Sequence, residues 1–128
     1  MTYTFNKIVK GSFDEVKEKV IEVLKLEKFG VVTEINLSGT IKNKLDIVMP
    51  RYEILGVCSP KYAYDSVMAD EDMGAFLPCN ISLNEKQNEE VKVSVVNPVP
   101  YLSAVENAEV KKIALEVGEI MKRVSDSL

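Results

Sequence analysis

Two cysteines are the residues whose chemistry and sequence context stand out most in this chain. Cys58 lies within Gly56-Val57-Cys58-Ser59-Pro60, and Cys79 lies within the stretch Gly-Ala-Phe-Leu-Pro-Cys-Asn that ends at Asn80. Each cysteine is close to a proline, where the chain is expected to change direction. Since a thiolate is both a nucleophile and a metal ligand, residues 52–80 are the first candidate for a functional region.

Cys58 lies between an expected strand and a helix that begins near Pro60. The N–H groups and dipole of that helix favour a thiolate nearby, and Lys61 adds positive charge. These features predict an activated thiol that serves as a nucleophile or a redox centre. The alternative is a small buried hydrophobic residue at a strand end, a common role for free cysteine. Cys79 shares the apolar side of its expected strand with Ile81, which favours core packing there.

The spacing of the two thiols limits their redox and metal chemistry. Twenty residues separate them, which is not a Cys-x-x-Cys redox motif. A disulfide between Cys58 and Cys79 requires Cα atoms within about 7 Å of each other. The intervening Asp70, Glu71 and Asp72 could add oxygen ligands to a metal bound by the two thiols, but a solvated acidic turn at a helix end is the preferred interpretation of these residues. A zinc ion bridging two subunits is also open, but we expect no resident cofactor.

The complete absence of histidine removes most other catalytic arrangements. A Ser-His-Asp triad is impossible. The sequence also contains neither a Gly-x-x-x-x-Gly-Lys phosphate loop nor a Gly-x-Gly-x-x-Gly dinucleotide motif. No carboxylate pair has a spacing that suggests a hydrolase. The sequence therefore favours a non-enzymatic protein.

Aromatic and methionine side chains around the first cysteine motif suggest a pocket. Tyr52, Tyr62 and Tyr64 cluster there, and the following segment adds Met68, Met73 and Phe76. Such residues can line an apolar pocket with polar tips, and the Asn80 amide could lie at its mouth. The alternative is ordinary packing of a helix on a sheet.

Composition indicates a single domain over residues 1–128. Apolar residues make up 46% and charged residues 28%, with a net charge of −4, as in an ordinary soluble domain. The acidic balance leaves no basic stripe for nucleic acid. The N-terminus lacks the apolar core of a signal peptide, and no apolar run is long enough to span a membrane. We therefore expect a cytoplasmic protein that binds neither nucleic acid nor membrane, in a compartment that keeps cysteines reduced.

Hydrophobic periodicity predicts five strands and four helices. The expected strands cover residues 2–9, 31–37, 51–58, about 78–85 and 91–95. The expected helices cover residues 13–29, 39–49, 61–68 and 103–128. The order is β-α-β-α-β-α-β-β-α, which predicts an α+β fold with a five-stranded, mixed or mostly antiparallel sheet and helices on one face. A parallel pairing of the strands joined by helix 61–68 is left open.

Several local signals set the expected element ends. Ser12-Phe13-Asp14-Glu15 and Ser103-Ala104-Val105-Glu106 are both of the capping-box form. Gly30 is expected to close the first helix as its C′ residue, and Gly74 to mark a turn. Ser59 and Pro60 suit the N-cap and N1 positions of the third helix. The Leu77–Pro78 peptide bond is expected to be trans.

Two motifs in the middle of the chain carry a resemblance to a known family. They comprise Tyr52, Ile54, Leu55, Gly56, Val57, Cys58, Pro60, Lys61, Ala63 and Tyr64, then Gly74, Leu77, Pro78, Cys79 and Asn80. Together with the hairpin segment 91–98 they resemble the domain-of-unknown-function family 302 (DUF302), over essentially the whole chain. The resemblance implies a TATA-binding-protein-like α+β fold, with a curved sheet backed by long helices, and a homodimer.

The family resemblance supplies no activity. TATA-box binding does not follow from the fold, because fold does not imply function and this chain is acidic. Two positions depart from the family pattern. Ser59 stands where asparagine is frequent, and Asn97 stands where aspartate often precedes the proline.

Two functional hypotheses follow. The first is a non-enzymatic cytoplasmic module, acting as a homodimer, that binds a small ligand or a protein partner. Its expected ligand-binding residues are Tyr52, Gly56, Cys58, Pro60, Tyr64, Gly74, Leu77, Pro78, Cys79 and Asn80. The second is a thiol-dependent redox or metal-binding protein that uses Cys58 and Cys79. Replacement of either cysteine by serine distinguishes them, because only the second function requires the sulfur atoms.

Overall fold

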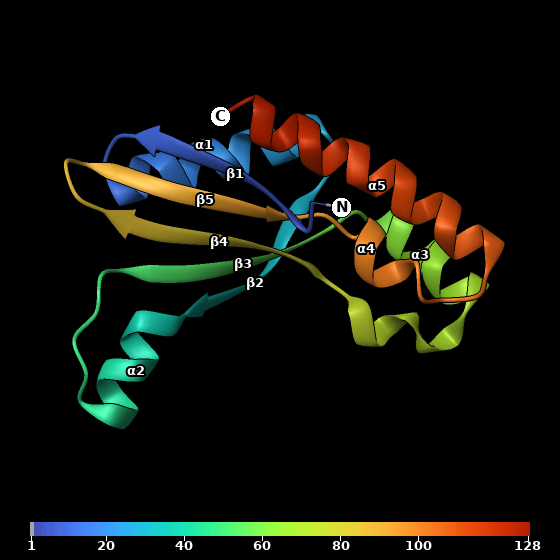
Figure 1. The fold of residues 1–128 in the computed structure, drawn as a ribbon, viewed down its shortest axis with the longest axis horizontal. Helices are drawn as coiled ribbons and strands as arrows, with labels where there is room; N and C mark the ends of the chain where they lie inside the picture. The colour runs from blue at the N-terminus through green and yellow to red at the C-terminus, as the bar shows by residue number, and fades with distance from the viewer. Residues whose placement is uncertain (1) are drawn as a thin grey trace.

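A five-stranded antiparallel sheet organises the chain, whose residues 2–128 are described by a computed structural model (Figure 1). The strands are β1 (Thr4–Lys10), β2 (Gly30–Asn36), β3 (Tyr52–Cys58), β4 (Cys79–Lys86) and β5 (Glu90–Val96). Their order across the sheet is β1-β5-β4-β3-β2, and all four pairings are antiparallel. The predicted α+β class is confirmed, whereas the parallel pairing left open for β3 and β4 is wrong.

Two long helices cover one face of this sheet. They are α1 (Phe13–Leu26) and α5 (Ala108–Asp126), and α5 runs from above the middle of the sheet to the end where α3 and α4 lie (Figure 1). Alternate strand residues and the apolar stripes of both helices form the main core. Its fully buried members are Val20, Leu24, Leu55, Val57, Ile81, Leu83, Val91, Val93, Val95, Met121 and Val124.

The smaller helices lie at opposite ends of the sheet. The helices α3 (Pro60–Ala69), η1 (Glu71–Phe76) and α4 (Val99–Leu102) gather at one end, and α2 (Leu37–Leu45) projects at the other (Figure 1). The α3–η1 segment forms the whole connection between the neighbouring strands β3 and β4. This connection therefore stands beside the strand ends that carry the two cysteines.

The first helix starts as predicted but ends earlier. Ser12 and Glu15 form the full reciprocal capping box, with both hydrogen bonds at 3.2 Å. The helix ends at Leu26, and the left-handed position after it belongs to Lys28, with φ 62°. Gly30 is the first residue of β2, so its prediction as the helix C′ residue is wrong. Here the turn accepts a lysine in a conformation that usually selects glycine.

The last helix begins later than its second capping-box sequence predicted. Asn107 is the N-cap, and its side-chain oxygen accepts hydrogen bonds from the N–H groups of Glu109 and Val110. The Ser103 hydroxyl instead donates to the Pro100 carbonyl at 2.7 Å, at the end of the unpredicted helix α4. Asn107 takes the N-cap position in place of Ser103 because its side-chain amide also donates to the Ala69 carbonyl at 2.9 Å. This tertiary contact cannot be predicted from the local sequence.

Helix α2 is shorter and earlier than expected. It begins after Asn36, whose side chain accepts from the Gly39 N–H, and ends at Asp46 in the left-handed conformation. Leu37 is thus helical and does not continue the strand. The early start reflects a good asparagine N-cap, which the alternating pattern of residues 31–37 concealed.

The segment before β4 differs from expectation in two ways. Gly74 lies inside the 3₁₀ helix η1 and not in an isolated turn. The Leu77–Pro78 peptide bond is cis, which corrects the expected trans bond. For a bond preceding proline the two forms differ by only about 0.5–1 kcal/mol, so packing around the proline decides between them and the local sequence does not.

Gly56 occupies a position where a side chain does not fit. It lies on the sheet face opposite the two long helices, and the side chains of Thr33 and Pro78 close over it. A Cβ atom built on Gly56 would overlap the Thr33 side chain and lie 2.6 Å from Pro78 Cγ. The signature glycine therefore allows the segment before β4 to pack tightly on β3.

We predict that Gly56→Ala destabilises the fold by about 2 kcal/mol or more, because an overpacked methyl group must displace two neighbours. Gly74→Ala is the matched control, since within residues 2–128 no atom lies within 4 Å of its added Cβ. Urea unfolding monitored by circular dichroism measures both. Equal stability of the two variants would contradict this account.

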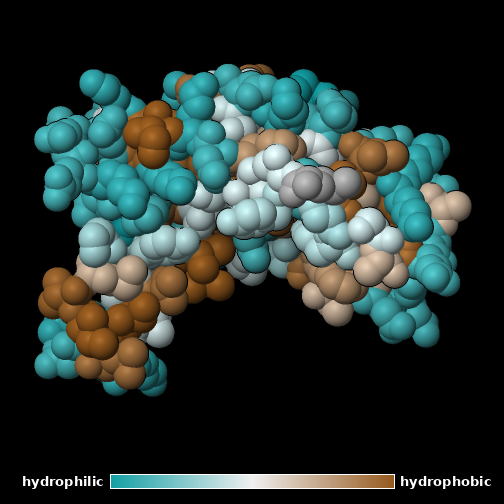
Figure 2. Space-filling view, in the orientation of Figure 1, coloured by the Kyte–Doolittle hydropathy of each residue, from teal (hydrophilic) through white to brown (hydrophobic). Residues whose placement is uncertain are grey.

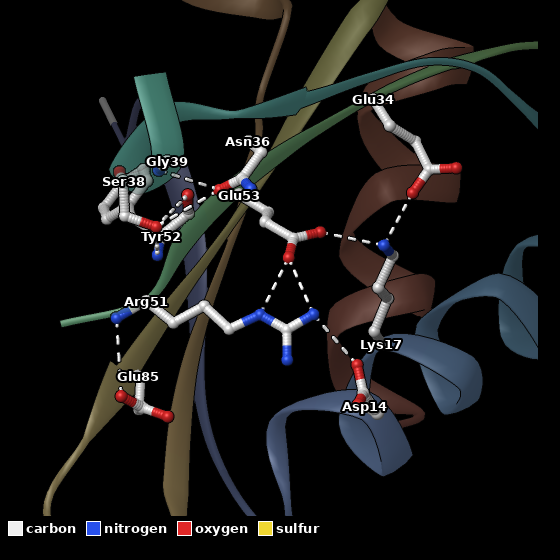
Figure 3. A network of polar contacts seen from close by, with 10 residues as sticks. All are labelled: Asp14, Lys17, Glu34, Asn36, Ser38, Gly39, Arg51, Tyr52, Glu53 and Glu85. Carbon is white, nitrogen blue, oxygen red and sulfur yellow. Dashed lines mark hydrogen bonds and ion pairs between the residues drawn. The ribbon is translucent and has the colours of Figure 1, made fainter. Parts of the chain in front are cut away.

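A charged network ties α1 to strands β2 and β3 (Figure 3). Glu53 is buried, and its two oxygens accept from Lys17 Nζ and Arg51 Nε, each at 2.8 Å. Lys17 also pairs with Glu34, and Arg51 also pairs with Asp14. The burial of Glu53 opposes its charged form, but the two hydrogen bonds prevail, and the pKa of Glu53 lies below its usual value.

Glu53→Gln is expected to destabilise the protein by about 2 kcal/mol at pH 7, because it removes the charge that both cations share. The lowered pKa means that the wild type loses this contribution as pH falls below about 4.3 and through the folded-state pKa. The difference between wild type and variant should therefore shrink in acid. The exposed Glu18→Gln on α1 is the control, and a pH-independent difference for Glu53→Gln would refute the ionic origin.

Candidate functional site

The two cysteines line one small cavity at the end of the sheet. Cys79 pairs directly with Val57, so the antiparallel register places it beside Cys58. The cavity is about 40 Å³. Its walls come from the ends of β3 and β4, from α3, η1 and α4, and from the middle of α5. The lining residues are Phe29, Val57, Cys58, Ser59, Tyr62, Ala63, Ser66, Met73, Phe76, Leu77, Cys79, Pro98, Tyr101, Leu102, Ile113, Ala114 and Val117.

Helix α3 forms one wall of the cavity. It begins at Ser59 and Pro60 as predicted, although within residues 2–128 the Ser59 hydroxyl makes no capping hydrogen bond. The Tyr62 ring stacks on Phe29 with centroids 6.3 Å apart. The buried Ser66 hydroxyl donates back to the Tyr62 carbonyl at 2.7 Å. These contacts hold in place the face of α3 that lines the cavity.

Asn97 positions the opposite wall. This buried side chain donates to the Thr2 carbonyl at 2.8 Å and accepts from the Val99 N–H at 3.2 Å. It thereby ties the N-terminal segment to the first turn of α4, which carries Tyr101. A carboxylate at this position could not donate to the Thr2 carbonyl, so the amide of Asn97 suits this contact. Gly118 of α5 leaves room for the Asn97 and Val99 side chains.

Burial controls the protonation of the cavity's polar groups. Burial is the main cause that raises the pKa of Cys79 to about 11. The charge of the nearby Cys58 thiolate also raises this pKa, whereas interaction with the Tyr101 phenol lowers it. Burial also raises the pKa values of Cys58 and of Tyr101. Near neutral pH all three groups therefore carry their protons. The Cys58 thiol donates a long hydrogen bond to the Ser59 carbonyl, with Sγ and O 3.6 Å apart.

The raised pKa of Cys58 is opposite in direction to the helix-dipole prediction. Cys58 precedes the first turn of α3, and desolvation is the cause of its shift. Both cysteines are free thiols. Two protonated thiols thus line the same, mainly apolar cavity.

Some of the predicted site residues lie in this cavity. Cys58, Leu77 and Cys79 line it, together with the predicted aromatic and methionine residues Tyr62, Met73 and Phe76. Pro78 and Asn80 instead line a shallow neighbouring hollow. That hollow also contacts Phe76, Leu77 and Tyr101, so the two spaces share a wall.

The remaining predicted site residues lie elsewhere. Tyr52 is at the far end of β3, where its N–H donates to the Ser38 hydroxyl at 3.0 Å. Gly56 is on the open sheet face, and Pro60 and Gly74 are exposed on α3 and η1. Tyr64 is 65% exposed, and Met68 is also exposed. These residues do not line the cavity.

Tyr101 and the α5 residues are among the members of the site that sequence reasoning missed. Ile113, Ala114 and Val117 belong to the apolar stripe of α5, which pattern alone identifies only as core. Tyr101 follows two prolines in Pro98-Val99-Pro100, a signal for an irregular segment. The local sequence does not predict that Tyr101 lies near Cys79. The position of Tyr101 depends on the hydrogen bond from Asn97 to the Thr2 carbonyl, which joins distant parts of the chain.

Within residues 2–128, no three side chains of histidine, cysteine, aspartate or glutamate converge in a way that could hold a metal ion. No helix of the described chain has the length and apolar character needed to cross a membrane.

The chain forms a two-layer α+β domain, in which a layer of helices packs on one antiparallel sheet. A cavity lined by both cysteines lies at the end of this sheet. The sequence matches the family model "Domain of unknown function DUF302" over residues 5–128, and the chain belongs to that family. A solved structure with the same fold is described as "Crystal structure of uncharacterized conserved protein DUF302 from Bacillus stearothermophilus". It shares 23% identity, 99% of this chain and 98% of that chain are aligned, and the TM-score is 0.89.

No curated protein matches this sequence. The predicted family membership is confirmed, and the solved relative supports the fold alone. The activity of this chain must therefore be argued from its own site.

Both thiols should react slowly with iodoacetamide at pH 7–8, because burial raises their pKa values. Cys79 should be the slower of the two, with a rate that rises only toward about pH 11. Single-cysteine variants, Cys58→Ser and Cys79→Ser, followed by mass spectrometry, separate the two rates. Denatured protein supplies the control, and a fast native reaction with an apparent pKa below about 8.5 would contradict the assigned protonation.

Proposed function

We propose that this chain is a non-enzymatic binding module that takes a small, mainly apolar ligand in the cavity beside Cys58, Cys79 and Tyr101, and that it acts as a homodimer. The observation that supports the proposal is the convergence of both cysteine motifs on one cavity. Residues far apart in sequence are brought to it from β3, β4, α4 and α5. Concave apolar sites with few polar groups are the usual form of small-molecule sites.

The chemistry of the walls favours binding over reaction. Val57, Met73 and Val117 present aliphatic or thioether surface. The thiols and the phenols of Tyr62 and Tyr101 have raised pKa values, which keep them protonated and neutral. The Ser59 and Ser66 hydroxyls are also neutral. Neutral weak donors suit an uncharged ligand with one acceptor atom. A charged ligand would lose its hydration without gaining a counter-charge.

The size of the cavity limits the ligand. A volume of about 40 Å³ corresponds to room for only about two or three water-sized probes. Phe76 lines the cavity, is 42% exposed, and stacks on Tyr101 with centroids 5.9 Å apart. Any ligand larger than a few atoms therefore requires this aromatic pair to move outward, and η1, which buries only Met73, is the element that carries Phe76.

A thiol-dependent function is the second candidate, since Cys58 and Cys79 line the same cavity. A redox role joins the two sulfurs in a disulfide, with loss of two protons and two electrons to an external thiol–disulfide partner. The raised pKa values oppose this role, because the thiolate is the reactive form. Either function suits the cytoplasm, where free thiols stay reduced.

Small neutral aromatic probes test the proposed pocket. Benzene, phenol and indole titrated into the methyl-labelled protein should shift the NMR signals of Val57 and Val117 in a saturable way. Ala63→Leu fills the cavity from α3 and should abolish these shifts. The exposed Ala104→Leu, outside the cavity, is the matched control and should bind like the wild type.

The cysteine variants separate the two candidate functions. The binding module predicts that Cys58→Ser and Cys79→Ser retain probe binding within several-fold. Equal probe shifts in the wild type and Ala63→Leu, or none in either, would overturn the pocket proposal. Rapid disulfide formation in the wild type by oxidised glutathione would favour the thiol function.

A further inference from the structure

Three side chains separate the cysteine-lined cavity from a second, open space. Phe76, Leu77 and Tyr101 line both the cavity and the neighbouring hollow. The hollow measures about 270 Å³, against about 40 Å³ for the cavity. This Asn80 hollow also has lining residues of its own, Ala75, Pro78, Asn80 and Val96. Displacement of the shared wall therefore joins the enclosed cavity to a larger space that is open to solvent.

Phe76 is the part of the shared wall that can move most easily. Met73 is only 2% exposed and anchors η1 in a core cluster with Leu102. The three residues that follow Met73, the last of which is Phe76, are all exposed. Local opening favours segments with few buried apolar contacts. Displacement of the stacked Phe76–Tyr101 pair therefore starts at the Phe76 ring.

Asn80 gives the hollow a polar group. It pairs with Gly56 in the register of β4 and β3, so it lies on the sheet face that the two long helices leave open. Figure 2 shows this underside hollowed between α2 and η1. Asn80 is exposed, and its carboxamide can both donate and accept hydrogen bonds. A ligand can reach this amide without breaking into the core.

The lining of the two spaces selects an uncharged ligand. Within residues 2–128, neither the cavity nor the Asn80 hollow is lined by a charged side chain. A carboxylate or ammonium group would lose hydration there without meeting a counter-charge. A pure hydrocarbon would fill the cavity but would leave the Asn80 amide without a new partner. A ligand carboxamide complements Asn80 in both directions, because each group donates to and accepts from the other.

We propose that the cavity and the Asn80 hollow form one elongated site for an uncharged small molecule, whose apolar end lies beside Cys79 and whose carboxamide end binds Asn80. This inference rests on the proposed function and deepens it, because it names the ligand class and the residue that selects it. Phe76 lies between the two ends and moves aside for the bound molecule. The joined space also accommodates a ligand that the cavity of about 40 Å³ cannot hold alone.

Three probes of similar size test the ligand class in the methyl-labelled full chain. Phenylacetamide should shift the NMR signals of Val57 in the cavity and Val96 in the hollow together, with one dissociation constant. Toluene should shift Val57 and leave Val96 unaffected. Phenylacetate should bind about tenfold more weakly than phenylacetamide, or worse, because its charge is not compensated. Equal binding of the amide and the carboxylate would overturn the proposed selection.

Variants of Asn80 and Phe76 test the two assigned roles. Asn80→Ala should weaken phenylacetamide binding by about fivefold to tenfold and leave toluene binding unchanged, because only the amide loses hydrogen bonds. Asn84→Ala is the matched control, since Asn84 lies on the same face of β4 but outside the hollow. Phe76→Ala should raise the association rate of phenylacetamide several-fold, and an unchanged rate would contradict the assigned place of Phe76.

The cavity-filling variant separates failure of this inference from failure of the proposed function. The elongated site requires that Ala63→Leu and Asn80→Ala each weaken phenylacetamide binding. If Ala63→Leu abolishes toluene binding but Asn80→Ala binds the amide like the wild type, the pocket stands and the elongated site is overturned. Amide binding that Ala63→Leu does not affect places the probe in the hollow alone and also overturns it. If toluene and benzene both fail to shift Val57, the pocket proposal itself fails.

Discussion

The antiparallel pairing of β3 with β4 is the contact on which the rest of the site depends. It sets Val57 opposite Cys79 and Gly56 opposite Asn80, so the two motifs meet although about twenty residues separate them. Gly56 lacks a side chain where Thr33 and Pro78 close in, which allows the segment before β4 to pack tightly on β3. The intervening α3–η1 segment is then held over the strand ends, where it encloses the cavity. Glu53, on the same strand, anchors this arrangement to α1 through Lys17 and Arg51.

Local sequence patterns predicted those features that local interactions decide. The Ser12 capping box, the helix start at Pro60 and the alternating strand β5 all follow from residues near one another. The second capping box failed because Asn107 is stabilised by Ala69, far away in sequence. The placement of Cys58 and Cys79 together was a conditional prediction, since sheet order depends on long-range pairing. Tyr101 could not be assigned because its position depends on the contact between Asn97 and Thr2.

The two faces of the sheet have different tasks in this account. The face under α1 and α5 is filled by Leu55, Ile81 and Val93 and provides the stability of the fold. Within residues 2–128, no helix covers the middle of the opposite face, which is bordered by α2 at one end and η1 at the other. The cavity lies where these regions meet, beside η1.

The most direct test of the central claim is a crystal structure of the protein under xenon pressure. Xenon enters small apolar cavities without requiring a hydrogen bond. The account predicts one xenon atom between Val57, Cys79 and Val117, with the Phe76–Tyr101 pair displaced outward or more mobile than in the gas-free crystal. Side chains that close this space completely, with xenon bound only elsewhere, would contradict a ligand-binding cavity beside the two cysteines.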